Sequence, residues 1–177
     1  MTQLALSTLI PLEQVDPALV ERVLDDAFGP DRRQRTAYRI RAGRYAVPAL
    51  SFAALDDQDV LVGTIQAWPV ALTDSTGRAH PLIMVGPVAI EPDRQGQGFG
   101  RALMAAQAQA IDTGSIDPVA PLPQVLIGDE PYYGQFGFVE APRGWQCPGP
   151  WDPARLLVRG ASPVLLSQTG ELGPWRG

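Results

Sequence analysis

Near its middle the chain reads Val88-Ala89-Ile90-Glu91-Pro92-Asp93-Arg94-Gln95-Gly96-Gln97-Gly98-Phe99-Gly100-Arg101-Ala102-Leu103. An apolar, β-branched run stops at Pro92, a loop with three glycines follows, and a helix-like segment begins directly after it. A strand that turns tightly into a helix aims several backbone N–H groups at one point, and the helix dipole adds positive charge there. This segment therefore predicts an anion site, most often for phosphate, with Arg94 and Arg101 beside it as countercharges.

The spacing of the glycines excludes two common phosphate loops. Gly96, Gly98 and Gly100 form Gly-x-Gly-x-Gly, and Arg101 stands where a dinucleotide-binding loop needs its third glycine. A P-loop needs a lysine after its last glycine, and the chain contains no lysine. The pattern that remains is Gln95-x-x-Gly98-x-Gly100, although close packing of a helix on a strand can also require such glycines.

This pattern resembles the Gln/Arg-x-x-Gly-x-Gly/Ala motif of the GNAT superfamily of N-acetyltransferases. A second segment supports the resemblance, because Tyr133 and Gly137-Phe138 match the family's Tyr-x-x-x-Gly-Phe. The form Gly-Asp-x-x-Tyr-Tyr-x-x-Phe-Gly-Phe from Gly128, with Gly86-Pro87-Val88-Ala89-Ile90 upstream, is similar to a bacterial subgroup of uncharacterised acetyltransferases.

The resemblance implies acetyl-CoA as the co-substrate. Its pyrophosphate is expected on the amides of the glycine loop, and its pantetheine arm beside the backbone of the preceding strand. The implied cofactor-binding residues are Val88, Ala89, Ile90, Gln95, Gly96, Gln97, Gly98, Phe99, Gly100 and Arg101.

The resemblance places Tyr133 at the position of the family's general acid. A tyrosine with a pKa near ~10 stays protonated at neutral pH and can protonate a leaving thiolate, although the ring can instead serve only packing. Some family members carry a glutamate base where this chain has Met84, which cannot accept a proton. Asp129 is the candidate base, acting directly or through water, and Glu130 stands beside it. One alternative is that Asp129 only caps a helix, and another is that a water chain accepts the proton without a dedicated base. Glu91 is expected at the surface.

The fold class expected from the resemblance and the hydrophobic pattern is α/β (α+β). It consists of a mixed, mostly antiparallel sheet that is splayed at its central strands and flanked by helices. One domain is expected over residues 1–177, with a core at about 4–140 and C-terminal strands and a tail at 141–177. Proline cannot donate to a ladder, so Gly86-Pro87 predicts an interruption of the sheet.

The local patterns predict the individual elements. Asp16-Pro17 is a helix-start signal, and the helix after the glycine loop is expected to bury Phe99, Leu103, Ala106 and Ala110. The predicted helices are 17–28, 31–42 and 99–113, and the predicted strands are 4–11, 51–55, 60–72, 82–90, 156–158 and 164–166, with a connector at 115–123. A short buried strand from Val125 is also predicted, followed by a turn and one or two helical turns that end at Gly137.

Composition agrees with a soluble enzyme and excludes several classes. The chain has 177 residues, is 45% hydrophobic and carries a net charge of −5, which disfavours nucleic acid as a partner. No membrane span or signal peptide is expected, and the cytoplasm is the expected location. Cys147 and His80 are the sole cysteine and histidine, so no metal site is expected, and Cys147 is interpreted as an incidental thiol rather than a nucleophile.

Arginines are concentrated in the segment from Arg32 to Arg41. The pattern is typical of a solvated helix face, and the alternative is contact with the CoA 3′-phosphate or an acidic partner. In the family this region forms part of the acceptor site.

The sequence therefore predicts an acetyl-CoA-dependent N-acetyltransferase that acts by direct attack on a primary amine of a small molecule or a protein. Two alternatives remain open: a catalytically inactive CoA-binding regulatory module, and an acyltransferase that uses a longer acyl-CoA. The acceptor is not encoded in a readable motif, and the resemblance leaves a homodimer open.

Overall fold

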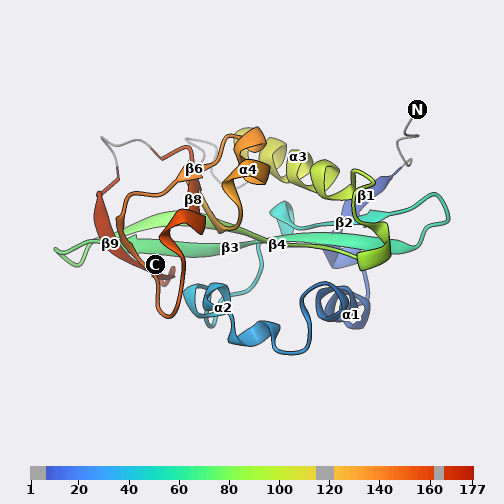
Figure 1. Cartoon of the computed structure of the whole chain (residues 1–177), viewed down its shortest axis with the longest axis horizontal. Helices are drawn as coiled ribbons and strands as arrows, with labels where there is room; N and C mark the ends of the chain where they lie inside the picture. The colour runs from blue at the N-terminus through green and yellow to red at the C-terminus, as the bar shows by residue number, and fades with distance from the viewer. Residues whose placement is uncertain (1–6, 115–121, 162–165) are drawn as a thin grey trace. The chain divides into compact units, whose positions relative to one another are not determined.

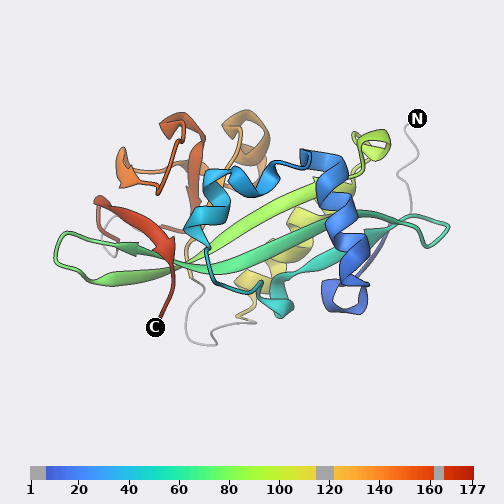
Figure 2. The same cartoon turned by 90° about the horizontal axis from the view of Figure 1, so that it is seen from below.

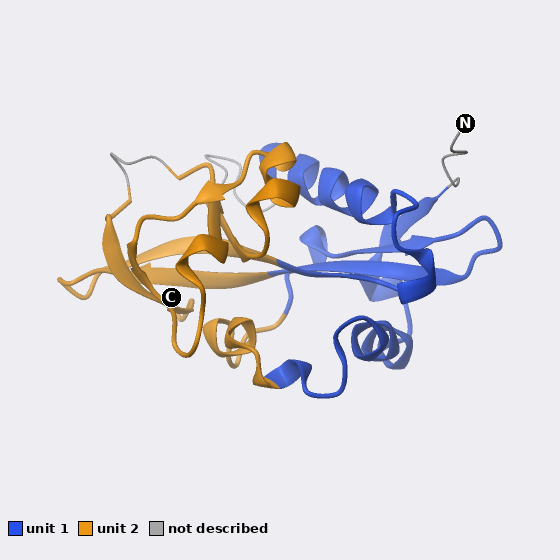
Figure 3. Cartoon of the chain, in the orientation of Figure 1, with its two compact units in different colours: residues 1–33, 46–67, 86–121 blue, residues 34–45, 68–85, 122–177 orange. Residues whose placement is uncertain are grey.

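The computed structural model describes residues 7–114, 122–161 and 166–177 of the chain. Its fold is a mixed, mostly antiparallel β-sheet flanked by helices (Figure 1), as predicted. The chain divides into two compact units, which Figure 3 shows in different colours: residues 1–33, 46–67 and 86–121, and residues 34–45, 68–85 and 122–177. Two long strands, β3 (Leu61–Thr73) and β4 (Ala79–Ile90), contribute residues to both units.

The first unit is built on strands in the order β1, β2, β3 and β4. β1 (Thr8–Pro11) pairs antiparallel with β2 (Phe52–Leu55), and β2 pairs antiparallel with β3. Helices α1 (Pro17–Phe28) and α3 (Phe99–Asp112) lie on opposite faces of these strands (Figures 1 and 2). The unit thus has three layers, with the strands in the middle.

Helix α1 begins where its sequence signal predicts. The Asp16 carboxylate accepts a hydrogen bond from the Ala18 N–H at 2.9 Å, and Pro17 occupies the first helical position, where no N–H is needed. The apolar stripe of the helix joins the sheet in one cluster of buried residues: Leu12, Val20, Val23, Leu24, Ala53 and Ala89.

Helix α3 buries a slightly different face from the predicted one. Ala106 and Ala110 are only half-buried, whereas the side chain of Gln107 is 1% exposed. Its amide donates hydrogen bonds to the carbonyls of Leu50 at 2.9 Å and Gln66 at 3.0 Å. A polar side chain is stable in this position because both of its N–H groups are paired.

The second unit contains the other ends of β3 and β4 and all of the later strands. Its strands follow the order β3, β4, β5, β8 and β6, while β9 pairs with β3 and β7 pairs with β9. The β4–β5 and β7–β9 pairs are parallel, and the β3–β9, β5–β8 and β6–β8 pairs are antiparallel. The elements are α2 (Thr36–Ile40), β5 (Gln124–Ile127), α4 (Glu130–Tyr133), β6 (Val139–Glu140), β7 (Gly144–Gln146), β8 (Leu156–Arg159) and β9 (Thr169–Pro174).

Single turns of 3-10 helix connect many of these elements. They are η1 (Leu12–Gln14), η2 (Arg32–Gln34), η3 (Pro48–Leu50), η4 (Pro92–Arg94), η5 (Gly134–Phe136) and η6 (Pro153–Arg155). The predicted helix at 31–42 is therefore wrong in length, because only η2 and the short α2 form there.

The ladder between β4 and β5 is short. It pairs Ile83 with Gln124 and Met84 with Val125, and it ends before the Gly86-Pro87 pair within β4. Proline lacks the N–H that a ladder needs at this point. The early end of this ladder agrees with the prediction that the sheet is splayed at its central strands.

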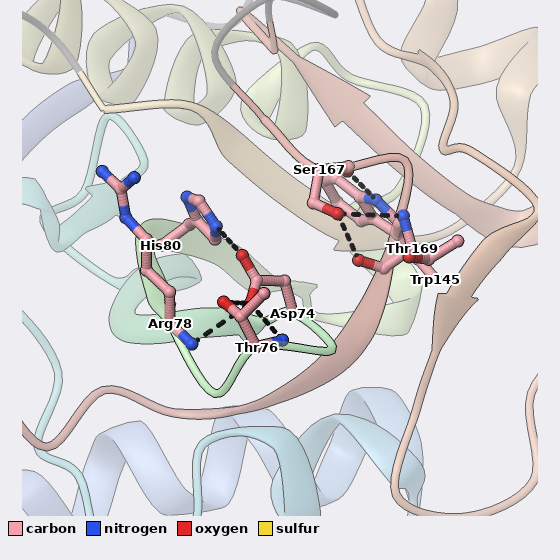
Figure 4. A network of polar contacts seen from close by, with 7 residues as sticks. All are labelled: Asp74, Thr76, Arg78, His80, Trp145, Ser167 and Thr169. Carbon is pink, nitrogen blue, oxygen red and sulfur yellow. Dashed lines mark hydrogen bonds and ion pairs between the residues drawn. The ribbon is translucent and has the colours of Figure 1, made fainter.

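The turn between β3 and β4 is organised by one carboxylate (Figure 4). Asp74 accepts hydrogen bonds from the N–H and hydroxyl of Thr76 at 2.9 and 2.6 Å, and from the N–H of Arg78 at 3.1 Å. His80 Nε2 lies 2.9 Å from the same carboxylate. The hydrogen bonds from Thr76 and His80 hold the pKa of Asp74 well below its usual range.

Within the second unit, the C-terminal segment pairs with β3 and β7 through β9, and it is also hydrogen-bonded to Trp145. The buried indole of Trp145 donates a hydrogen bond to the Ser167 carbonyl at 3.0 Å (Figure 4). Three predictions lie partly outside the described residues: the strand at 4–11, the connector at 115–123 and the strand at 164–166. Leu166, the described end of that last segment, is not in a strand.

Candidate functional site

The glycine loop connects β4 to α3 in the first unit. The Glu91 N–H donates to the Val62 carbonyl at 2.9 Å, so the strand is paired until the loop begins. Gly96 and Gly98 have φ angles of 77° and 93°, which side-chain-bearing residues rarely adopt. Both glycines are thus required by the backbone of the turn.

The N-terminus of α3 has no side-chain cap. The first helical hydrogen bond runs from the Ala102 N–H to the Gly98 carbonyl at 3.0 Å. The N–H groups of Phe99, Gly100 and Arg101 precede it and have no intrahelical acceptor. Since the loop before them is exposed, an anion can reach these amides and the positive end of the helix dipole.

The side chains of the loop have different roles. Gln95, Gln97 and Arg101 are exposed, whereas Phe99 is 2% exposed and fixes the first turn of α3 to the core. Arg101 has no ion-pair partner within the described part of the chain, so its charge is available to an anion.

Arg94, which the sequence predicts as a countercharge beside the loop, forms an ion pair within the first unit. Its Nη1 lies 2.8 Å from Oδ2 of Asp56, a residue of the turn between β2 and β3. This ion pair was not predicted, because the Asp-rich sequence at 56–59 indicated only a turn between two strands.

The strand before the loop presents its residues alternately to the two faces. Ala89 is fully buried and packs in the α1 cluster, so it can offer a ligand only its backbone. Val88 and Ile90 are half-buried, and Ile90 lies on the α3 face beside Gly63, where a Cβ would meet the Ile90 side chain. Backbone contacts at Val88, Ala89 and Ile90 are therefore compatible with the geometry of β4.

Glu91, which was expected at the surface, is half-buried. Burial and the nearby carboxylate of Asp26 raise its pKa, and Asp93 adds to the shift. The mouth of the glycine loop thus has acidic neighbours as well as Arg101.

Tyr133 and Asp129 belong to the second unit, at the two ends of α4. The Tyr133 ring makes edge contacts with Tyr132 at 4.9 Å and with Phe138 at 6.4 Å between centroids, and only glycine fits beside it at position 128. Burial, with smaller effects of Tyr132 and Asp129, raises the pKa of Tyr133 to about 12. The phenol is therefore protonated at neutral pH.

Asp129 occupies the N-cap position of α4, but its side chain caps no N–H. The carboxylate instead lies 3.0 Å from Nε of Arg155 and is 72% exposed. The alternative role as a side-chain cap is thus wrong, and the exposed carboxylate remains accessible to water and small molecules.

Three other residues named in the sequence analysis have surroundings that give each a structural explanation. Met84 is buried in the core cluster of the second unit, and His80 holds the hairpin through Asp74. Burial raises the pKa of the Cys147 thiol to about 11, so little reactive thiolate forms at neutral pH.

The basic segment agrees only in part with the prediction of a solvated helix face, because Arg33, Arg35 and Arg39 are exposed whereas Arg32 and Arg41 are buried. Arg32 is 2% exposed and forms ion pairs with Glu21 and Asp25, the latter at 2.8 Å. Arg41 is 6% exposed, and its guanidinium lies 4.0 Å from the Tyr38 ring centroid and 3.9 Å from that of Trp68. These two arginines serve packing within their own units.

The described residues contain neither a membrane-spanning helix nor a cluster of metal-ligating side chains. No helix there is long and apolar enough to cross a membrane. Within the same ranges, no group of three His, Cys, Asp or Glu side chains is arranged to hold a metal ion.

Comparison with known proteins gives one family match. A model described as "Acetyltransferase (GNAT) domain" matches residues 48–140, more than half of the chain, including the glycine loop and Tyr133. No curated protein matches the chain.

Several solved structures share the fold. A GNAT family N-acetyltransferase (YhbS) from Escherichia coli in complex with CoA is 23% identical to this chain, with a TM-score of 0.68. The match covers 97% of this chain and 89% of the Escherichia coli chain. A GNAT family acetyltransferase from Brucella melitensis in complex with acetyl-CoA is 24% identical, with a TM-score of 0.50 and coverages of 88% and 96%. The ribosomal-protein-S18-alanine N-acetyltransferase of Escherichia coli is 17% identical, with a TM-score of 0.52 and coverages of 92% and 100%.

Proposed function

Because this chain belongs to the GNAT family of acetyltransferases, we propose that it transfers the acetyl group of acetyl-CoA to a primary amine of a small molecule or a peptide. The observation that carries the proposal is the uncapped N-terminus of α3, with its exposed glycine loop. Structures of the same fold have been solved with CoA and with acetyl-CoA, which supports the same co-substrate here.

The glycine loop has the properties needed to hold the pyrophosphate of acetyl-CoA. The amides from Gln95 to Arg101 supply N–H donors, and the Arg101 guanidinium adds a positive charge. Backbone groups of Val88 to Ile90 hold the pantetheine arm as a neighbouring strand would.

In the proposed reaction, the neutral amine nitrogen attacks the thioester carbonyl carbon. A C–N bond forms and the C–S bond breaks, and Tyr133 donates its phenolic proton to the sulfur that leaves. Asp129, directly or through water, accepts the proton that the amine nitrogen loses. Alignment of the two reactants supplies the largest part of the acceleration, since proximity can account for ~7–11 kcal/mol.

Calorimetric titration of acetyl-CoA and of CoA tests the first part of this proposal. We expect micromolar affinity, roughly −8 kcal/mol, because several amides and one arginine meet a multiply charged phosphate group. Absence of binding at millimolar acetyl-CoA would mean that the loop serves only chain packing.

A panel of amines then tests transfer, with release of free CoA thiol as the readout. Binding without amine-dependent CoA release would favour a regulatory module without catalysis, for which the absence of a carboxylate at Met84 is the supporting observation. Faster turnover with longer acyl donors than with acetyl-CoA would favour the acyltransferase alternative.

A further inference from the structure

The Arg94 side chain connects three parts of the first unit. Its Nη1 lies 2.8 Å from Asp56 Oδ2, its Nε donates to Gln97 Oε1 at 3.3 Å, and its Cζ lies 5.5 Å from the centroid of the Phe99 ring. Gln97 in turn donates to the Asp93 carbonyl at 3.5 Å. One guanidinium thus contacts both the middle and the end of the glycine loop.

The partner of Arg94 is itself held rigidly. Asp56 is 6% exposed, and its Oδ1 accepts hydrogen bonds from the N–H groups of Gln58 and Val60, both at 2.9 Å. The Arg94 hydrogen bond, followed by the backbone bonds, lowers the pKa of Asp56. Asp56 is therefore an ionised anchor on the turn between β2 and β3.

We infer that the Arg94–Asp56 pair is a positioning device that fixes the glycine loop in the conformation that binds the phosphates of acetyl-CoA. The inference rests on the proposed function and adds a role for two residues that do not themselves touch the ligand. Gly96 and Gly98 allow the chain many conformations, and the pair selects one of them before the ligand arrives. The charge of Arg94 is already compensated by Asp56, so Arg101 is the loop's cation for phosphate.

Asp56→Asn separates this role from direct phosphate binding by Arg94. Asparagine can still accept the two backbone bonds through its oxygen, but its amide nitrogen cannot accept from Arg94. If the pair positions the loop, Asp56→Asn weakens acetyl-CoA binding by about threefold to tenfold. If Arg94 is instead a phosphate ligand, the same change frees its charge and strengthens binding.

The experiment compares wild type, Asp56→Asn, Arg94→Met, the double variant and Asp57→Asn in calorimetry with acetyl-CoA. Asp57 is exposed in the same turn and gives a charge-matched control, which is expected to bind as wild type. We expect each single variant to weaken binding, and the double variant to be no weaker than Arg94→Met alone, because both remove one interaction. In turnover assays the KM for acetyl-CoA should rise while kcat stays within about twofold, since no catalytic group is changed.

Three results would overturn the inference. They are tighter binding by Asp56→Asn, fully additive losses in the double variant, and a lower melting temperature with unchanged acetyl-CoA affinity. Failure of the proposed function gives a different result, because wild type itself would then bind no acetyl-CoA.

Discussion

At the scale of single residues, the Tyr133 phenol has a proton that is held tightly. Burial raises its pKa to about 12, well above the ordinary value of 10.0. The shift keeps the group protonated at all physiological pH values, but it also makes the phenol a weaker acid toward the thiolate that leaves. If Tyr133 is the acid, its contribution to the rate is modest. The pH dependence of kcat then shows no decline from ionisation of Tyr133 below about pH 11.

Tyr133→Phe should lower kcat by ~10²-fold, the lower end of the range for general acids, and should leave acetyl-CoA affinity nearly unchanged. Tyr132→Phe is the matched control, because its neighbouring ring is 42% exposed and has no assigned proton transfer. Steady-state kinetics between pH 6 and about pH 10 provides the measurement. Equal rates for Tyr133→Phe and the control would assign Tyr133 to packing.

At the scale of elements, the anion site proposed at the start of α3 depends on glycine occupying the position where other helices carry a capping side chain. Gly98 has a φ of 93° and leaves the amides of the first turn open. An aspartate here would bring a carboxylate to the amides that a phosphate needs. The same residue would also strain the left-handed backbone by ~1–2 kcal/mol.

Gly98→Asp should abolish detectable acetyl-CoA binding in calorimetry. Gly77→Asp separates the effect of the site from that of strain and charge, since Gly77 has a φ of 83°, is exposed and lies in the β3–β4 turn. The free energy of unfolding should fall by a similar amount in both variants, and only Gly98→Asp should fail to bind acetyl-CoA. Retained affinity in Gly98→Asp would refute the loop as the phosphate site.

Elements with strong local signals could be predicted from the sequence, whereas pairings between distant segments could not. The cap at Asp16, the glycines of the loop and the interruption at Gly86-Pro87 each act within a few residues, so their patterns are readable. Arg94 and Asp56 are 38 positions apart, and nothing local to either residue indicates the other. The burial of Arg32 likewise depends on its ion pairs with acidic residues of α1. The local sequence does not show these partners, so the pattern around Arg32 indicated an exposed helix face.

At the scale of the whole molecule, each unit contains an aspartate whose folded-state pKa lies below the value of 3.8 for a solvated group. These are Asp56, lowered mainly by Arg94, and Asp74, lowered mainly by Thr76. A lowered carboxyl pKa stabilises the folded state above the unfolded pKa, and this stabilisation disappears as the pH falls. Glu91, with its raised pKa, acts in the opposite direction: its contribution to stability is greatest at low pH and is lost as the pH rises through its folded pKa.

Thermal unfolding should therefore show a falling melting temperature as the pH is lowered from about 5 to about 2. Asp74→Asn should have a lower melting temperature than wild type at neutral pH. Its melting temperature should fall less than that of wild type on acidification, because its side chain no longer titrates. Asp57→Asn, an exposed charge change, should follow the wild-type curve. Parallel curves for Asp74→Asn and wild type would show that the hairpin carboxylate does not determine acid stability.

The division into two units also separates the chain's chromophores. All four tryptophans (Trp68, Trp145, Trp151 and Trp175) and all four tyrosines (Tyr38, Tyr45, Tyr132 and Tyr133) belong to the second unit, whereas the glycine loop belongs to the first. Intrinsic fluorescence and near-ultraviolet absorbance consequently follow the second unit, and the first is optically silent apart from its phenylalanines. A tryptophan introduced at Phe99 would give the loop a signal of its own.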